Sequence, residues 1–215
     1  NGGPGCSSLI GFSQENGPLV FGEFSKNLIS NTYSWNKKAN IIYLESPTGV
    51  GYSYNLSDKP EDLKLDDEIT GQENLEAVID FLNKFDQFTK NDFYIAGESY
   101  AGIYVPVLAN KILEHNAASK ENNINLKGIM VGNAYTDTTV DSHEAHPEFA
   151  FSRNLIGEEM KTEYVNKCIL STDECYKVKS EIATVTITAK VMVKFRRSPI
   201  PTSLIMNLAL IGIPI

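Results

Sequence analysis

A serine, Ser99, stands in the run GESYAG at residues 97–102, directly after a β-branched and aromatic run and directly before an apolar helical pattern. A serine on a sharp turn between a strand and a helix is the setting of a nucleophile elbow, in which small residues two positions away on either side avoid a steric clash. The N–H group of Tyr100, at the start of the helix, would point at an oxyanion formed on attack. We therefore predict that Ser99 is the nucleophile of an acyl-transfer reaction.

A second oxyanion donor is expected from the glycine-rich run NGGPG at residues 1–5, because glycine lets a backbone approach a reacting group closely. The alternative interpretation of residues 97–102 is a tight turn without a catalytic role, since Ala101 stands where the general nucleophile pattern has glycine. The strand and helix on either side of Ser99 favour the catalytic interpretation.

The rest of the chain predicts the elements that hold this turn. Short β-branched and aromatic runs indicate strands at residues 40–44, 92–96 and 126–131. Apolar residues at helical spacing indicate two helices between them, one beginning near a capping box of Thr70 and Glu73 and one over residues 104–115. Strands and helices in this order are typical of βαβ units, so we predict an α/β fold with a mostly parallel sheet flanked by helices.

Composition limits the class of partner. A net charge of −8 without a basic segment argues against nucleic acid, because nucleic-acid-binding proteins concentrate Lys and Arg. The last apolar stretch, residues 204–215, is shorter than the roughly 20 residues of a spanning helix, so we expect no membrane partner. The cysteines lack metal-ligand spacing, and His143 and His146 lack a third ligand, so we expect no metal and no cofactor.

Four runs occur together in this chain, namely NGGPGCSS at 1–8, ENGP at 15–18, ESPTGVGYSY at 45–54 and GESYAG at 97–102. In this order they resemble the serine carboxypeptidase family, whose members are acid-active α/β-hydrolases of vacuoles, lysosomes and secretions. The resemblance extends to about Cys175 and implies an α/β-hydrolase fold, peptide substrates with a free C-terminus, and a vacuolar, lysosomal or secreted location. It also implies that Ser99 attacks the scissile carbonyl while the N–H groups of Gly3 and Tyr100 form the oxyanion hole.

The resemblance further implies that Asn1, Glu15 and Glu98 bind the free carboxylate of the peptide. Two glutamates repel a carboxylate unless a proton is shared among the three groups, so acid pH would favour binding. Without the resemblance, Glu15 is an ordinary exposed loop carboxylate.

Two covalent features are also expected. Cys6 matches a family cysteine that forms a disulfide, and neither Cys168 nor Cys175 can be assigned as its partner. Asn55 opens the N-glycosylation triplet NLS, which matters only in a secreted chain.

We expect residues 1–140 to form a partial α/β-hydrolase core, residues 141–179 to begin a helical lid insertion, and residues 180–215 to be a divergent tail of doubtful origin. The chain opens at Asn1 inside a motif and without Met, so we expect it to be incomplete at both ends. The tail after about Lys179 resembles nothing in the family. We hypothesise that a retained intron or frameshift replaced the true C-terminal third, which transcript sequencing across residues 178–188 would test.

No run matches the motifs of the family's catalytic Asp and His. The three histidines, His115, His143 and His146, are expected on the surface or in the lid, because a triad histidine belongs on a loop beyond the last strands. Asp137 and Asp141 are expected in a turn after the third strand. A serine hydroxyl without a base is a weak nucleophile, so we expect the chain as it stands to be inactive.

Three functions fit these features. The first is a serine-type carboxypeptidase that releases C-terminal residues through an acyl-enzyme on Ser99. The second is an acyltransferase on the same scaffold, which passes the acyl group to an alcohol instead of water. The third is a catalytically dead binding or chaperone-like homologue, which the absence of an Asp and a His favours. The preferred side chains of the substrate and the oligomeric state cannot be read from the sequence.

Overall fold

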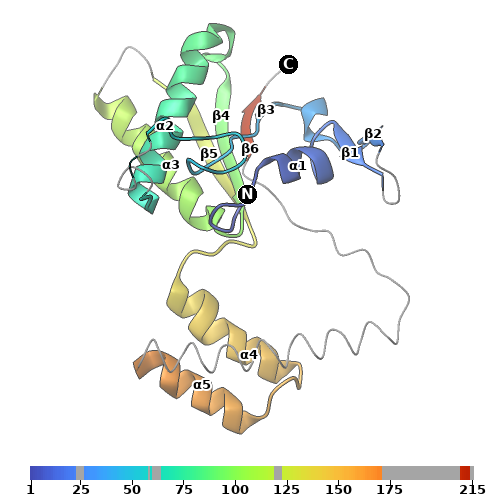
Figure 1. Ribbon diagram of the computed structural model, residues 1–215, viewed down its shortest axis with the longest axis vertical. Coiled ribbons are helices and arrows are strands. Elements are labelled where there is room, and N and C mark those ends of the chain that lie inside the picture. Colours follow the sequence, from blue (N-terminus) through green and yellow to red (C-terminus); the bar gives the residue numbers. More distant parts are fainter. Residues whose placement is uncertain (23–26, 58, 60–63, 119–122, 171–208, 214–215) are drawn as a thin grey trace. The chain divides into compact units, whose positions relative to one another are not determined.

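A computed structural model describes residues 1–22, 27–57, 59, 64–118, 123–170 and 209–213. These residues belong to two compact units (Figure 1). The first contains residues 1–135 together with the strand at 209–213, and the second begins at Thr136.

A four-stranded sheet forms the centre of the first unit, in the order β3-β6-β4-β5. Its strands are β3 (Asn40–Ile42), β4 (Asp92–Glu98), β5 (Leu126–Gly132) and β6 (Ala209–Ile213). β4 and β5 are parallel, whereas β6 is antiparallel to both β3 and β4. β3 and β4 therefore run in the same direction, so the predicted parallel arrangement of the three N-terminal strands is confirmed. The antiparallel strand between them was not predicted.

Two long helices cover one face of this sheet, α2 (Asp67–Lys84) after β3 and α3 (Ala101–Ala118) after β4 (Figure 1). The core between them and the sheet is apolar and buried, and includes Leu75, Val78, Phe93, Ile95, Val105, Leu108 and Ile112. On the opposite face of β4, Ala96 packs with Ala39 and Trp35. Both faces of β4 are therefore covered, which explains why its sequence is a nearly continuous run of apolar residues.

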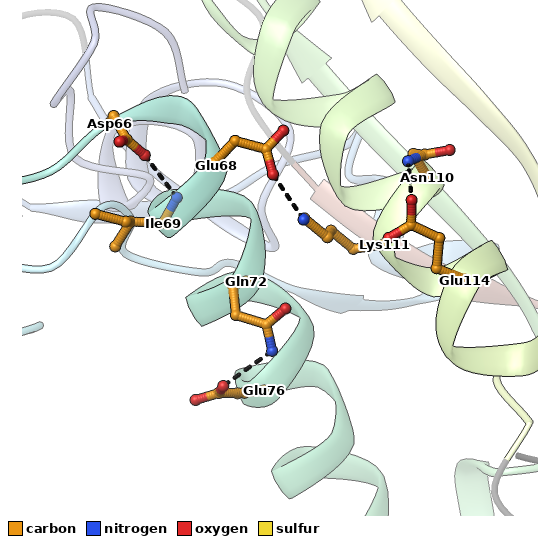
Figure 2. Close-up of polar contacts among 8 residues, drawn as sticks. All are labelled: Asp66, Glu68, Ile69, Gln72, Glu76, Asn110, Lys111 and Glu114. Atoms are coloured by element: carbon orange, nitrogen blue, oxygen red, sulfur yellow. Dashed lines mark hydrogen bonds and ion pairs between the residues drawn. The ribbon is translucent and has the colours of Figure 1, made fainter. Parts of the chain in front are cut away.

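The predicted start of α2 was wrong. The helix begins at Asp67, and the carboxylate of Asp66 accepts the N–H of Ile69 at 2.8 Å as its N-cap (Figure 2). Thr70 is 3% exposed inside the helix, and Glu73 accepts a hydrogen bond from the Thr48 hydroxyl at 2.8 Å. Both residues of the expected capping box therefore make tertiary contacts in place of a cap.

Helices α2 and α3 approach closely because Gly71 has no side chain. A Cβ at Gly71 would lie 2.4 Å from Cγ1 of Val107 on α3. At the rim of this contact, Lys111 and Glu68 form an ion pair with an N–O distance of 2.6 Å (Figure 2). An ion pair at the surface adds little to stability, so the close apolar contact is the main link between the helices.

The first unit also carries a short helix, α1 (Leu9–Gln14), and a separate hairpin of β1 (Leu19–Phe21) and β2 (Leu28–Ser30). The second unit is helical, as predicted, with a π-helix (Thr139–Glu144), α4 (Ala145–Ser152) and α5 (Glu158–Leu170). Its small core contains Ala150, Ile156, Tyr164 and Cys168. The expected tail, residues 180–215, lies outside the described residues except for β6. Among the described residues, no helix is long and apolar enough to cross a membrane.

Candidate active site

Ser99 lies at the carboxyl end of β4, immediately before α3, as predicted. Its φ angle is +60°, in the left-handed region that is strained for a residue with a side chain. The surrounding backbone holds this conformation. The Ser99 N–H donates to the carbonyl of Gly132 at 3.1 Å, and the Ser99 carbonyl accepts the N–H of Tyr135 at 2.8 Å. The end of β5 therefore fixes the turn that presents the serine.

The residues after the serine are small for two different reasons. Ala101 is fully buried in the core of the first unit. A Cβ at Gly102 would lie 2.4 Å from the carbonyl oxygen of Tyr135. The site that admits only glycine is therefore Gly102, and a methyl group is accommodated at Ala101.

The glycine-rich loop lies against Ser99. A Cβ at Gly2 would stand 2.5 Å from Cβ of Ser99, 2.8 Å from its Oγ and 2.8 Å from the backbone N of Tyr100. The loop is closed by a hydrogen bond from the N–H of Cys6 to the carbonyl of Gly2 at 3.1 Å, and Gly3 has a φ of +115°. The structure thus brings the predicted loop and the predicted nucleophile into contact.

Asn1 and Glu98, two members of the predicted carboxylate-binding set, are buried in the first unit. They are 4% and 7% exposed, respectively. The backbone nitrogen of Asn1 donates to the hydroxyl of Ser8 at 3.2 Å. The Oδ1 atom of Asn1 is buried and has no hydrogen-bond partner among the residues described, an unmet capacity that is unusual away from binding sites.

The position of Glu15 is set by the loop that follows α1. Its carbonyl accepts a hydrogen bond from Nδ2 of Asn31 at 2.9 Å. The next residue, Asn16, accepts the hydroxyl of Tyr43 at 2.6 Å. Burial, followed by the charge of Glu15, raises the pKa of Tyr43 to about 12, so this hydroxyl stays a donor at physiological pH. The run ENGP is thus tied to Asn31 and to Tyr43, the residue just after β3, through partly buried hydrogen bonds.

Tyr100 has partners that the sequence did not indicate. Its hydroxyl donates to Asp67 Oδ1 at 3.1 Å, and its ring stacks on Tyr135 with centroids 5.9 Å apart. Burial and the hydrogen bond to Asp67 raise the pKa of Tyr100. The side chain is thereby tied to α2, which leaves its backbone N–H beside Gly2. Asp67 stands 33 positions away, so no local pattern could have found this contact.

His115, the histidine of the first unit, lies far from Ser99. His115 lies in the last turn of α3, and at 1.5 Å per residue it is about 20 Å along the helix from Ser99. His143 and His146 belong to the second unit, in the π-helix and in α4.

Asp137 lies in the loop after β5, as predicted, whereas Asp141 lies in the π-helix, so the turn predicted at Asp141 was wrong. Oδ2 of Asp141 accepts the N–H groups of Thr136 at 2.6 Å and Asp137 at 2.9 Å, and Oδ1 of Asp137 accepts the N–H of Val140 at 2.9 Å. Their carboxylates therefore accept hydrogen bonds from backbone N–H groups at the start of the second unit.

The stability of this segment depends on pH through the carboxylate of Asp141. Hydrogen bonds from the N–H groups of Asp137 and Thr136, and the charge of His146, lower the pKa of Asp141 below its usual 3.8. The charged carboxylate thus stabilises the fold above that value, and the contribution is lost as the pH falls through the lowered pKa. We expect Asp141→Asn to lower the urea midpoint at pH 6 and to have little effect at pH 2. An equal loss at both values would contradict this.

Cys6 and Asn55 lie in the first unit. Cys6 is an exposed free thiol, so the expected disulfide is not formed in this structure, whereas Cys168 is disulfide-bonded. Asn55 is half-buried, and its Oδ1 accepts the N–H of Ser57 at 2.8 Å. The glycosylation triplet thus folds as a local turn.

Comparison with known proteins agrees with this geometry. The model of a family described as serine carboxypeptidase matches residues 1–207, so the expectation that the resemblance ends near Cys175 was wrong. Serine carboxypeptidase 24 of Arabidopsis thaliana is 54% identical over 144 residues, which cover 66% of this chain and 30% of that protein. Serine carboxypeptidase-like 35 of the same plant is 42% identical over 185 residues, covering 82% and 38%.

A solved structure has the same fold. Kex1(Δ)p, a prohormone-processing carboxypeptidase from Saccharomyces cerevisiae, matches with a TM-score of 0.75 and 28% identity over 86% of this chain and 43% of its own. The chain spans about a third of the length of the curated relatives quoted above. The fold is that of an α/β-hydrolase, as predicted, and the chain belongs to the serine carboxypeptidase family.

Proposed function

We propose that the full-length protein is a serine-type carboxypeptidase, which releases C-terminal residues from peptides through an acyl-enzyme on Ser99. The observation that carries this proposal is the strained Ser99 turn with the glycine-rich loop packed against its hydroxyl. Family membership supports hydrolysis of peptides as the reaction.

The chemistry assigns a role to each group at the turn. The Ser99 oxygen attacks the scissile carbonyl, its proton passes to a base, and the N–H groups of Gly3 and Tyr100 stabilise the oxyanion of the tetrahedral intermediate. The base then gives this proton to the departing nitrogen as the intermediate collapses, which expels the C-terminal residue as an amine and leaves an ester on Ser99. Water then hydrolyses this ester and regenerates the serine.

Asn1, Glu15 and Glu98 are proposed to hold the carboxylate of the departing residue. Support comes from the burial of Asn1 and Glu98 and from the buried Oδ1 atom of Asn1, which has no hydrogen-bond partner among the residues described. A carboxylate can join two glutamates only when a proton is shared, so substrate binding should strengthen at acid pH. An acidic vacuole or lysosome, or an acidic secretion, would suit such a site, and Asn55 would then be a candidate for glycosylation.

The base is the part of the triad that the first unit does not supply near Ser99. Because an unactivated serine is a weak nucleophile, we propose that this chain by itself is inactive and that the missing Asp and His belong to sequence beyond it. Residues 1–140 would then be part of the catalytic core and residues 141–179 the start of the lid. Within residues 180–215, strand β6 pairs with β3 and β4 of the core sheet, so that stretch is not proposed as a separate tail.

The test uses the full-length protein and a fluorophosphonate, which reacts with activated serines. We expect labelling at Ser99, release of the C-terminal residue from a blocked dipeptide at acid pH, and loss of both in Ser99→Ala. Transfer of the acyl group to an added alcohol with little hydrolysis would favour an acyltransferase. A protein that binds peptides but is not labelled would favour a binding homologue and overturn the proposal.

A further inference from the structure

We propose that Glu45 is a positioning residue, which holds the glycine-rich loop where its backbone N–H group can donate a hydrogen bond to the oxyanion. This role rests on the proposed function, because it assumes that the loop beside Ser99 acts in acyl transfer. Glu45 follows β3 and has no role in the carboxylate-binding set.

The carboxylate of Glu45 joins two segments that are far apart in the sequence. Its Oε1 accepts the hydroxyl of Ser7 at 2.6 Å and the N–H of Leu9 at 3.3 Å, both just after the glycine-rich loop. Its Oε2 accepts the N–H of Tyr52 at 3.1 Å. Each carboxylate oxygen therefore faces a different segment.

The segment after Glu45 folds tightly around the side chain. The Glu45 carbonyl accepts the hydroxyl of Ser53 at 2.6 Å. A Cβ at Gly51 would lie 1.2 Å from Oε2 of Glu45, and Gly51 has a φ of +57°. Only glycine permits this approach, so the half-buried carboxylate is enclosed by its own loop and differs from an ordinary surface glutamate.

The glycine-rich loop is thus held at two ends. Its first end is fixed by the packing of Gly2 on Ser99 and by the bond from Cys6 to Gly2. Its far end continues into Ser7, which Glu45 holds through the shortest of its hydrogen bonds. Because the hydrogen bonds to a charged acceptor are stronger than neutral ones, removing the carboxylate should free the far end. The oxyanion donor at Gly3 lies between the two ends.

The experiment compares three variants of the full-length protein by the rate of fluorophosphonate labelling at Ser99. Glu45→Ala removes every side-chain bond and should slow labelling by about tenfold to a hundredfold, below the loss of about 10²–10³ for a deleted oxyanion donor. Glu45→Gln keeps one carbonyl acceptor and should be intermediate. Ser7→Ala should slow labelling less than Glu45→Ala. The double variant should react about as slowly as Glu45→Ala alone, because both substitutions remove the same contact.

A matched control is Glu73→Ala. Glu73 accepts a hydrogen bond from Thr48 at 2.8 Å, so it supports the same segment as Glu45, and this bond does not involve the glycine-rich loop. We expect this variant to be labelled at the wild-type rate. On the blocked dipeptide, Glu45→Gln should lower kcat more than it raises KM, because the donor acts mainly in the transition state.

The outcomes separate the two proposals. If the wild type is labelled and folded Glu45→Gln and Ser7→Ala react at the same rate as it does, the role of Glu45 is overturned and the proposed function stands. If Glu73→Ala is slowed as much as Glu45→Ala, the effect reflects general destabilisation of the segment, and the role is likewise overturned. If the wild type itself is not labelled, both proposals fall.

Discussion

Replacing Gly2 by alanine should slow the reaction of Ser99 with a fluorophosphonate by about 10²–10³, the loss typical of a missing oxyanion donor. The added Cβ would stand 2.5 Å from Cβ of Ser99 and 2.8 Å from the N of Tyr100, and both atoms belong to the fixed nucleophile turn. The glycine-rich loop must therefore move, and the N–H of Gly3 moves with it. The measurement is the second-order rate of labelling of the full-length protein.

The expected effect is steric. Gly2 does not have the positive φ that Gly3 has, so an alanine is compatible with its backbone, and the clash alone should account for the loss. The matched control is Gly157→Ala in the second unit, where an added Cβ meets nothing within 4 Å. Labelling of Gly2→Ala at the rate of the Gly157→Ala control would contradict the packing of this loop on Ser99.

Replacing Leu108 by alanine should lower the free energy of unfolding by about 2–5 kcal/mol. Leu108 lies on α3 with no exposed surface, in the core shared with α2 and β4. Truncation removes buried methyl groups and leaves a cavity that the surrounding helices and strand can fill only in part. Urea denaturation with a fixed m-value gives the measurement.

Leu113 provides an unusually close control for this variant. It is a leucine on the same helix, but 58% of its surface is exposed. Leucine and alanine have similar helix propensities, so Leu113→Ala should change stability by no more than about 0.5 kcal/mol. If the two variants lost the same stability, the buried face of α3 would be assigned incorrectly.

The strength of the Ser99 prediction came from local patterns. A strand, a turn and a helix are each determined by side-chain period and backbone sterics over a few residues, and all three occur where the sequence indicated. The same local reasoning failed at Thr70, which looks like a helix cap but is buried, because an acceptor at Asp66 caps the helix instead. Burial of a polar residue depends on what packs over it, which a local pattern does not contain.

The sequence by itself therefore determined the class of fold, the nucleophile turn and the family, because the four runs and the βαβ order are local features of the chain. Only the tertiary structure showed which distant groups support Ser99. Ser7 meets Glu45 across 38 positions, Tyr100 meets Asp67 across 33, and β6 enters the sheet between β3 and β4. These contacts depend on how the folded chain returns on itself, and hydrogen-bonding groups of the same types elsewhere in the sequence could have served equally well.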